Sequence, residues 1–298
     1  MKAKGATMTR QTMAIDRTQI YFELTKPRIT AMVLLTVGAG FTLAGGMTNV
    51  ALLHVMFGAG LSCIGSGALN QYWERETDGL MHRTRFRPLP TRKVSPTTVL
   101  SFGAFIAIAG VAYLAATVGA TAAAINAATV ISYLFVYTPL KPRTPVSTLV
   151  GAIPGALPPV IGWTAASGSI DAGAAVLFGI LFLWQIPHFL AIGRMHRDDY
   201  AAAGLPMLAV VDPHGQVDGA QMKLYAAALI PVSLLLVPLG VAGHLYFWIA
   251  LPSGLVYWAV AMQTAGTASP EAARKLLLTS VIYLPIISAA IVVEGMLQ

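Results

Sequence analysis

A succession of long apolar segments constrains what this chain can fold into more than any other feature. About nine segments are long and apolar enough to cross a bilayer, at residues 29–47, 50–72, 98–118, 121–140, 147–167, 171–192, 224–243, 245–264 and 276–297. A helix of about 20 apolar residues spans the hydrocarbon core and satisfies its own backbone hydrogen bonds there. Only 10% of the residues are charged, against about 25% in soluble domains. The sequence therefore predicts an all-α polytopic membrane protein with about nine transmembrane helices.

The basic residues predict the orientation of these spans. All 19 Lys and Arg residues fall in the N-terminal arm or in loops on one side of the nine-span topology. The positive-inside rule makes that side cytoplasmic, with the N-terminus inside and the C-terminus outside. Residues 1–25 are predicted to form a flexible cytoplasmic arm and residues 26–298 a single membrane domain. The net charge of +7 then reflects topology, anionic membrane lipid and an anionic substrate, and it indicates no nucleic-acid partner.

Three oxygen-bearing side chains follow one another at a spacing of four where the second span ends. Asn70, Glu74 and Asp78 project from one face if the helix continues through them. Amide and carboxylate oxygens are ligands for hard cations such as Mg²⁺. The alternative, decoration of a helix end, is weakened because acids near a helix C-terminus oppose the helix dipole. We therefore predict a metal site at the membrane surface.

Basic side chains accompany this motif on the same predicted side of the membrane. Arg83 and Arg87 follow it directly, and Tyr137, Lys141 and Arg143 lie around the next inner loop. Arg and Lys bind phosphate oxygens, and Arg can do so with two parallel hydrogen bonds. Ordinary positive-inside charge explains the same residues adequately. Their position beside acids favours contact with a metal-bound diphosphate.

A second acidic pair, Asp198 and Asp199, lies in the long inner loop after the sixth span. Both are candidate metal ligands. Adjacent residues do not share a helix face, so we expect Asp199 alone to point inward and to complete a two-metal site with the first motif. The alternative is a solvated pair that neutralises Arg194 and Arg197.

His188 lies near the cytoplasmic end of the sixth span, directly after Pro187. An ionisable side chain inside a membrane helix is a candidate functional group. This imidazole could act as a general base, contact a haem or form a helix–helix hydrogen bond, and His196 is a candidate of the same kind. Trp184 could line an isoprenoid channel and stabilise a carbocation through its ring face. It could equally belong to the interfacial aromatic belt.

Taken together, these motifs resemble the UbiA superfamily of intramembrane prenyltransferases over about residues 20–295. Within that superfamily they are most similar to the members that farnesylate haem B. Quinone-precursor members usually carry a second acid-rich helix where this chain has Pro187-His188-Phe189. The matching residues are Asn70, Gln71, Glu74, Asp78, Met81, Arg83, Thr84, Arg87, Pro88, Leu89, Tyr137, Thr138, Lys141, Arg143, Thr144, Gln185, Pro187, His188, Phe189, Asp199, Tyr200, Gly204, Pro206 and Met207.

The resemblance implies a UbiA-like helical bundle with a central cavity, and a transferase. It implies farnesyl diphosphate and haem B as substrates, haem O and diphosphate as products, and Mg²⁺ as the ion. His188 would orient the porphyrin or position the water that quenches the carbocation. The implied metal ligands are Asn70, Glu74, Asp78 and Asp199, the implied diphosphate ligands are Arg83, Arg87, Lys141 and Arg143, and the candidate haem or isoprenoid contacts are His188, His196, Tyr200 and Trp184.

The resemblance also implies a setting for the reaction. Haem A synthase or terminal-oxidase assembly factors are the implied protein partners, because haem O would be destined for a terminal oxidase. The cytoplasmic membrane of a bacterium is favoured over the mitochondrial inner membrane.

Two other functions stay open from the sequence. A UbiA-type enzyme with an aromatic or quinone-precursor acceptor would keep the same diphosphate site but would not need Pro187-His188-Phe189. A non-enzymatic haem-handling membrane protein would not need the first acidic motif. Ion transport is disfavoured because almost every charge lies in an inner loop, away from the middle of the membrane.

Overall fold

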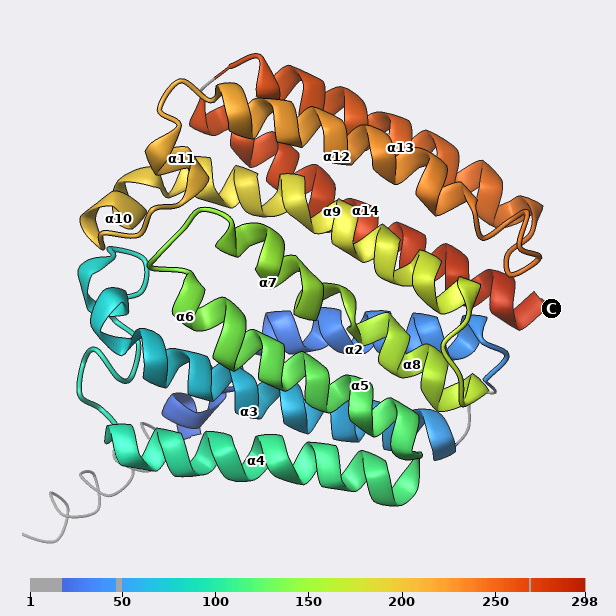
Figure 1. Cartoon of the computed structure of the whole chain (residues 1–298), viewed down its shortest axis with the longest axis horizontal. Coiled ribbons are helices and arrows are strands. Elements are labelled where there is room, and N and C mark those ends of the chain that lie inside the picture. The colour runs from blue at the N-terminus through green and yellow to red at the C-terminus, as the bar shows by residue number, and fades with distance from the viewer. Residues whose placement is uncertain (1–17, 47–49, 268, 298) are drawn as a thin grey trace, which may run out of the picture.

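The regular structure of this chain is entirely helical in the part that the computed structural model describes, residues 18–46, 50–267 and 269–297. A short helix over residues 18–24 precedes the elements of Figure 1. Those elements are α2 (Pro27–Leu43), α3 (Val50–Leu80), α4 (Pro96–Thr117), α5 (Ala120–Ile131), the π-helix η1 (Ser132–Tyr137), α6 (Thr138–Leu140), α7 (Ser147–Ala156), α8 (Pro158–Ser167), α9 (Ala172–Met195), α10 (Arg197–Ala202), α11 (Leu208–Val211), α12 (Gln216–Leu234), α13 (His244–Ala265) and α14 (Pro270–Leu297).

The long helices form a multi-span membrane bundle, as the apolar segments predict. Seven helical runs among the described residues are long and apolar enough to cross a membrane: Val50–Leu80, Pro96–Thr117, Ala120–Leu140, Ser147–Ser167, Ala172–Met195, His244–Ala265 and Pro270–Met296. The remaining two predicted spans correspond to α2, which is apolar but has 17 residues, and to α12. Large apolar side chains such as Phe105 and Trp248 are 71% and 69% exposed on the outside of the bundle. Such a surface is suited to lipid.

The span predicted at 224–243 is displaced towards the N-terminus. The helix α12 begins at Gln216 and ends at Leu234. Beyond it lie Pro238 and Gly240, and Gly240 has a φ of 68°. Proline cannot continue a helix and a left-handed glycine favours its end, so the chain turns before the apolar segment is finished.

Both long polar loops gather at one end of the bundle. Figure 1 shows the connection from α3 to α4 beside α10 and α11 at the left, whereas the C-terminus lies at the right. The short connections, such as those from α4 to α5 and from α8 to α9, lie at the right as well. The charged loops therefore share one side of the bundle, and the assignment of that side to the cytoplasm stays a prediction.

Two of the spans are interrupted, the fifth in its middle and the fourth near this polar end. The fifth breaks at Leu157, between α7 and α8, because Pro158 and Pro159 cannot donate backbone hydrogen bonds. The fourth changes from α5 into the π-helix η1 directly before Thr138 and Pro139. Short π segments inside α-helices are frequent at functional sites. Here the segment precedes Lys141, one of the predicted site residues.

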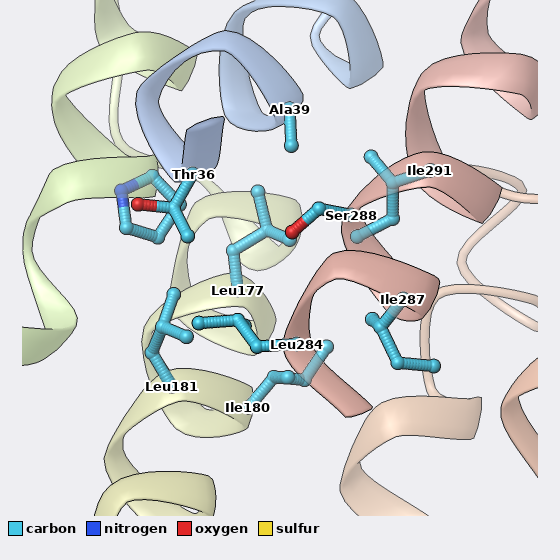
Figure 2. A pocket seen from close by; sticks show the side chains of 10 residues that line it. Thr36, Ala39, Leu177, Ile180, Leu181, Leu284, Ile287, Ser288 and Ile291 are labelled. Carbon is cyan, nitrogen blue, oxygen red and sulfur yellow. The ribbon is translucent and has the colours of Figure 1, made fainter. Parts of the chain in front are cut away.

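The helices α2 and α8 lie in backbone contact. A Cβ atom on Gly162 would stand 1.9 Å from the carbonyl oxygen of Val37, and one on Gly40 would stand 2.0 Å from that of Pro159. Only glycine allows this approach, as small residues do at helix interfaces in membranes. Beside the contact, a cavity of about 20 Å³ lies between α2, α8, α9 and α14 (Figure 2). Its lining is almost wholly apolar: Thr36, Ala39, Pro159, Leu177, Ile180, Leu181, Leu284, Ile287, Ser288 and Ile291.

Replacing Gly162 by alanine should destabilise the bundle, because the new methyl group would force α2 and α8 apart. Overpacking of this kind costs about 1–3 kcal/mol. Thermal unfolding of the detergent-purified protein measures the effect. Gly38→Ala is the matched control on α2, since a Cβ there meets nothing within 4 Å. Equal stability of the two variants would contradict the prediction.

Candidate active site at the polar end of the bundle

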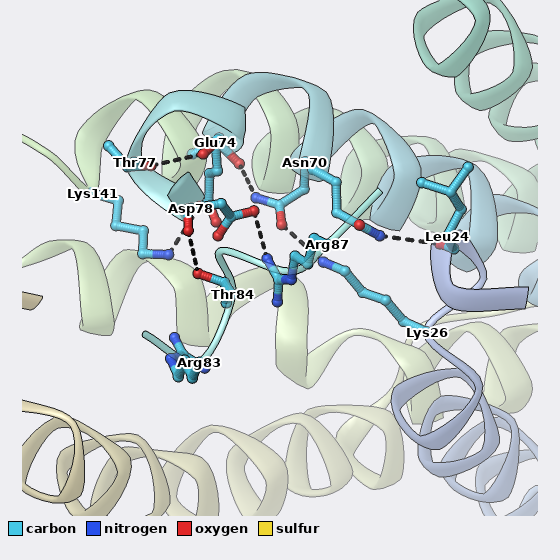
Figure 3. Close-up of polar contacts among 12 residues, drawn as sticks. Leu24, Lys26, Asn70, Glu74, Thr77, Asp78, Arg83, Thr84, Arg87 and Lys141 are labelled. Atoms are coloured by element: carbon cyan, nitrogen blue, oxygen red, sulfur yellow. Dashed lines mark hydrogen bonds and ion pairs between the residues drawn. The ribbon is translucent and has the colours of Figure 1, made fainter. Parts of the chain in front are cut away.

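The first acidic motif lies on the last turns of α3, on one face as its spacing predicts. Asn70 and Asp78 are buried, and Asp78 is only 1% exposed. Glu74 is half-buried between them. Glu76, which lies on another face of the helix, has a side chain that is 84% exposed. The structure thus brings Asn70, Glu74 and Asp78 together, facing the interior (Figure 3).

Each of these three side chains is paired with one cation. Lys26 Nζ donates to Asn70 Oδ1 over 2.9 Å, and Lys141 Nζ donates to Glu74 Oε1 over 2.9 Å. Arg87 donates to Asp78 Oδ2 over 2.7 Å. Figure 3 shows the three cations reaching the motif from three separate segments of the chain. Two carboxylates and three cations leave this cluster with a surplus of positive charge, which suits a polyanion.

Lys26 is the site residue that the sequence did not reveal, because it was counted as ordinary positive-inside charge. It precedes Pro27 in the left-handed conformation, with a φ of 47°, which is uncommon for a residue with a side chain. Its methylene chain lies beside Gly67, where a Cβ would stand 3.5 Å from Lys26 Cδ, an ordinary packing distance. Burial, together with the nearby charge of Arg87, lowers the pKa of Lys26 to about 8. The sequence around Lys26 carries no signal that sets it apart from the other basic residues before the first span.

The cluster fits a divalent cation at Asp78. Asp78 Oδ1 is buried and has no hydrogen-bond partner among the described residues, which is costly for a carboxylate oxygen. A bound cation would satisfy it. Asn70, Glu74 and Asp78 together offer the hard oxygen atoms that Mg²⁺ prefers. No group of three or more His, Cys, Asp or Glu side chains converges for a metal ion within the described ranges, so no third acid joins Glu74 and Asp78 there.

The two members of the second acidic pair lie in different environments. Asp198 is exposed. Asp199 accepts hydrogen bonds from the backbone N–H of His82 at 2.9 Å and of Arg83 at 3.3 Å. Desolvation alone would raise the pKa of Asp199, but these two hydrogen bonds outweigh it and lower that pKa. The carboxylate therefore holds the loop that carries Arg83, and its predicted role as a metal ligand stays a prediction.

The alternative reading of that acidic pair is wrong for Arg194. The Arg194 guanidinium is buried and binds Asp218 through Nε, at 3.0 and 2.9 Å, and through Nη2. It also donates to the carbonyl oxygens of Thr264 and Thr267, both at 2.7 Å. Arg194 thus joins α9 to the ends of α12 and α13, a long-range pairing that loop charge alone does not reveal.

The predicted basic residues occupy three different environments. Arg83 donates to the Tyr200 hydroxyl over 2.9 Å and lies over its ring at 5.3 Å, so Tyr200 holds an arginine. Burial acts against the charge of Lys141, but Tyr137 and Glu74 outweigh it and raise the pKa of this lysine. Arg143 is exposed.

Tyr137 and Thr138 form one wall beside the acidic motif. The Tyr137 ring stacks on that of Tyr133 at 5.5 Å. It also lies against Gly151, where a Cβ would stand 2.6 Å from the ring. Thr138 accepts from Asn70 Nδ2 over 3.4 Å. Tyr137 therefore packs against α7, and Thr138 contacts α3.

His188 belongs to a separate cluster, which lies between α9 and α14. Its Nδ1 lies 2.7 Å from Ser280 Oγ on α14, and its ring stacks on Trp184 at 5.0 Å. Trp184 in turn donates to the carbonyl oxygen of Ser280 over 2.9 Å. His196 lies at the junction of α9 and α10, and burial together with Arg83 lowers its pKa. The candidate residues thus form two groups, a polar one on the last turns of α3 and an aromatic one between α9 and α14.

Comparison with known proteins identifies the family of this arrangement. The model of the UbiA prenyltransferase family matches residues 32–283. A protoheme IX farnesyltransferase of Solibacter usitatus is 46% identical, over 90% of this chain and 95% of that protein. A solved structure of digeranylgeranylglyceryl phosphate synthase has a TM-score of 0.78 at 15% identity, covering 94% of this chain and 99% of the other. A UbiA homologue from Archaeoglobus fulgidus, bound to GPP and Mg²⁺, has a TM-score of 0.62 at 15% identity, covering 92% and 99%. The chain belongs to the UbiA prenyltransferase family.

Proposed function

We propose that the protein is a protohaem IX farnesyltransferase of a bacterial cytoplasmic membrane. It transfers the farnesyl group of farnesyl diphosphate to a vinyl group of haem B and adds water, giving haem O and diphosphate. The observation that carries the proposal is the buried cluster in which Asn70, Glu74 and Asp78 are each paired with a cation. Similarity to a protoheme IX farnesyltransferase over nearly its full length supports the choice of substrates.

The cations of the cluster bind the diphosphate in this scheme. Lys26, Lys141 and Arg87 lie on the carboxylates and the amide in the substrate-free protein, and they turn to the diphosphate oxygens when the substrate arrives. Arg83 and Arg143 add charge at the entrance of the site. Preorganised positive charge of this kind stabilises the leaving group as its negative charge grows, which is where electrostatics contribute most.

Asn70, Glu74 and Asp78 would hold Mg²⁺, with Asp198 and Asp199 as further ligands. When bound, Mg²⁺ supplies charge neutralisation at the departing diphosphate. Asp199 could join this set only by giving up its hydrogen bonds to the backbone of His82 and Arg83. A Mg²⁺-bound homologue of the same fold supports the choice of metal.

In this scheme, the aromatic cluster of Trp184 and His188 serves the haem acceptor. Loss of diphosphate leaves an allylic cation at C1 of the farnesyl chain, and the haem vinyl group attacks it. Tyr137 and Trp184 would present their ring faces to this cation, because such faces stabilise positive charge. Water then captures the resulting cation on the vinyl carbon. Haem A synthase or terminal-oxidase assembly factors would receive the product.

Activity of the purified protein in nanodiscs tests this proposal. Haem B, farnesyl diphosphate and Mg²⁺ should give a haem that carries farnesyl plus water, detected by chromatography and mass spectrometry. The product should be absent with EDTA. Prenylation of an aromatic acid or quinone precursor in place of haem would refute the acceptor and keep the diphosphate site.

Replacing Lys26 by methionine should reduce kcat/KM for farnesyl diphosphate by about 10- to 100-fold. This range corresponds to the loss of one hydrogen bond to a charged group, worth about 1.5–3 kcal/mol. Initial rates at varied farnesyl diphosphate measure it. Lys93→Met is the control, because Lys93 is exposed in the loop between α3 and α4. Unchanged kinetics of Lys26→Met would remove Lys26 from the site.

A further inference from the structure

The short helix over residues 18–24 is packed on the bundle by one of its faces. Ile20 and Leu24 lie four residues apart, so they share a face of the helix. Their side chains are 7% and 0% exposed, respectively, whereas Phe22 and Glu23 are exposed. The buried face therefore ties this helix to the bundle directly before Lys26.

The buried face of the helix belongs to an apolar cluster that joins it to three other elements. The other members of the cluster are Ala68 on α3, Leu89 in the loop from α3 to α4, and Val99 on α4. Two of these members are close neighbours of site residues along the chain. Asn70 follows Ala68 by two residues, and Arg87 precedes Leu89 by two. The cluster thus holds together the segments that bring polar groups to the candidate site.

The chain between this helix and α2 keeps Lys26 in a backbone conformation that its neighbour disfavours. A residue before proline prefers the extended region, but Lys26 is left-handed, with a φ of 47° and a ψ of 58°. Such a conformation persists only where the surrounding structure holds it. On one side, Gln71 Nε2 donates to the carbonyl oxygen of Leu24 over 3.5 Å (Figure 3). On the other, the backbone N–H of Thr30 donates to the carbonyl oxygen of Lys26 over 3.1 Å.

We infer that Leu24 is a positioning residue for the diphosphate of the prenyl substrate and acts through Lys26. The inference rests on the proposed function, in which Lys26 binds that diphosphate. While Leu24 stays in the cluster, Lys26 keeps its left-handed backbone, and its ammonium group lies 2.9 Å from Asn70 Oδ1. Once Leu24 is released, the backbone of Lys26 relaxes to the extended region, and the ammonium group leaves the site. An apolar contact outside the site thereby sets the position of one of its cations.

Diphosphate binding without an acceptor tests the inference separately from prenyl transfer. The full chain in nanodiscs is titrated calorimetrically with farnesyl diphosphate and with inorganic diphosphate, in the presence of Mg²⁺ and without haem. Leu24→Ala should weaken the binding of both ligands by about tenfold, the lower end of the loss expected for one hydrogen bond to a charged group. Leu24→Met keeps most of the side-chain volume and should restore the wild-type affinity.

A double-mutant cycle with Lys26→Met shows whether Leu24 acts through Lys26. In the Lys26→Met background, Leu24→Ala should change the affinity by less than about twofold, because the group that it positions is already gone. Leu114→Ala is the matched control. Leu114 is also 0% exposed, but its cluster towards the other end of α4 contains none of the site residues. Both leucine variants should lower the unfolding temperature, and only Leu24→Ala should weaken diphosphate binding.

The outcomes separate the inference from the proposed function. Equal diphosphate affinity of the wild type and a folded Leu24→Ala protein would overturn the inference and leave the function intact. A loss that persists undiminished in the Lys26→Met background would also overturn it, because Leu24 would then act through another group. A wild type that binds neither ligand would overturn the proposed diphosphate site and the inference with it. If Leu24→Ala fails to fold, Ile20→Ala takes its place in the cycle, with the same expected and contrary results.

Discussion

Replacing Asp78 by asparagine should reduce farnesyl transfer by about 100- to 1000-fold. The change removes the only buried carboxylate of the motif that has an oxygen without a partner in the described structure, and with it the proposed metal ligand. Loss of a single preorganised electrostatic group in an active site has this magnitude. The rate of haem O formation at saturating Mg²⁺ and farnesyl diphosphate measures the effect.

Glu76→Gln is the matched control for this variant. Glu76 stands two residues earlier on α3 but is directed outwards, so its neutralisation should leave activity near that of the wild type. Asp78→Asn also leaves Arg87 without its carboxylate partner. Thermal unfolding must therefore be measured beside the rate, to separate catalysis from stability. A folded Asp78→Asn protein with wild-type activity would refute the metal site on α3.

Replacing Arg194 by methionine should destabilise the protein by about 3–5 kcal/mol. The side chains of Arg194 and Asp218 are 6% and 1% exposed, and removing one partner of a buried ion pair leaves the other charge uncompensated. Methionine keeps much of the side-chain volume, so the effect reports the lost charge and hydrogen bonds. Unfolding of the detergent-purified protein, followed by heat or denaturant, measures the difference.

Arg197→Met is the matched control for this second variant. Arg197 is exposed three residues further along the chain, and substitutions at such positions usually change stability by less than about 0.5 kcal/mol. Combining Arg194→Met with Asp218→Leu should recover part of the loss, because no charge is then buried alone. Equal stability of the Arg194 and Arg197 variants would show that the buried pair contributes nothing.

The pairing of each motif residue with a cation has a consequence for substrate binding. In the free protein, Lys26, Lys141 and Arg87 already compensate the oxygen atoms of the motif, so the site is assembled before any ligand enters. In the proposed function, the carboxylates of Glu74 and Asp78 would hold the metal, and the three cations would bind the diphosphate. Neither charge would then be left alone in the partly buried site.

Much of the fold could be predicted from the sequence because its signals are local. The hydrocarbon core demands long apolar helices, so spans appear as runs of apolar residues. The spacing of Asn70, Glu74 and Asp78 places them on one helix face without any knowledge of the rest of the chain. Pro158 and Pro159 end a helix by their own chemistry. At Pro238 and Gly240, apolar composition favours a continued span whereas the two residue types favour a helix end. There the predicted end of the 224–243 span was wrong, because α12 ends at Leu234.

The pairings within the site could not be predicted in this way. Lys26 and Asn70 lie 44 residues apart and Lys141 and Glu74 lie 67 apart, while Ser280 and His188 lie 92 apart. Nothing in the neighbouring residues distinguishes Lys26 from the other basic residues before the first span. Nor does anything there distinguish Asp218 from the loop acids as the partner of Arg194. Asp199, expected beside the first motif, is instead bonded to the backbone of His82 and Arg83.

The sequence by itself therefore determined the class of fold, the polar end of the bundle and the chemistry of the first motif. The tertiary structure decided which cation meets which oxygen, which acid stays apart, and which helix His188 contacts. The physical reason is that helix periodicity and membrane burial act through neighbouring residues, whereas ion pairs and hydrogen bonds depend on how separate helices pack.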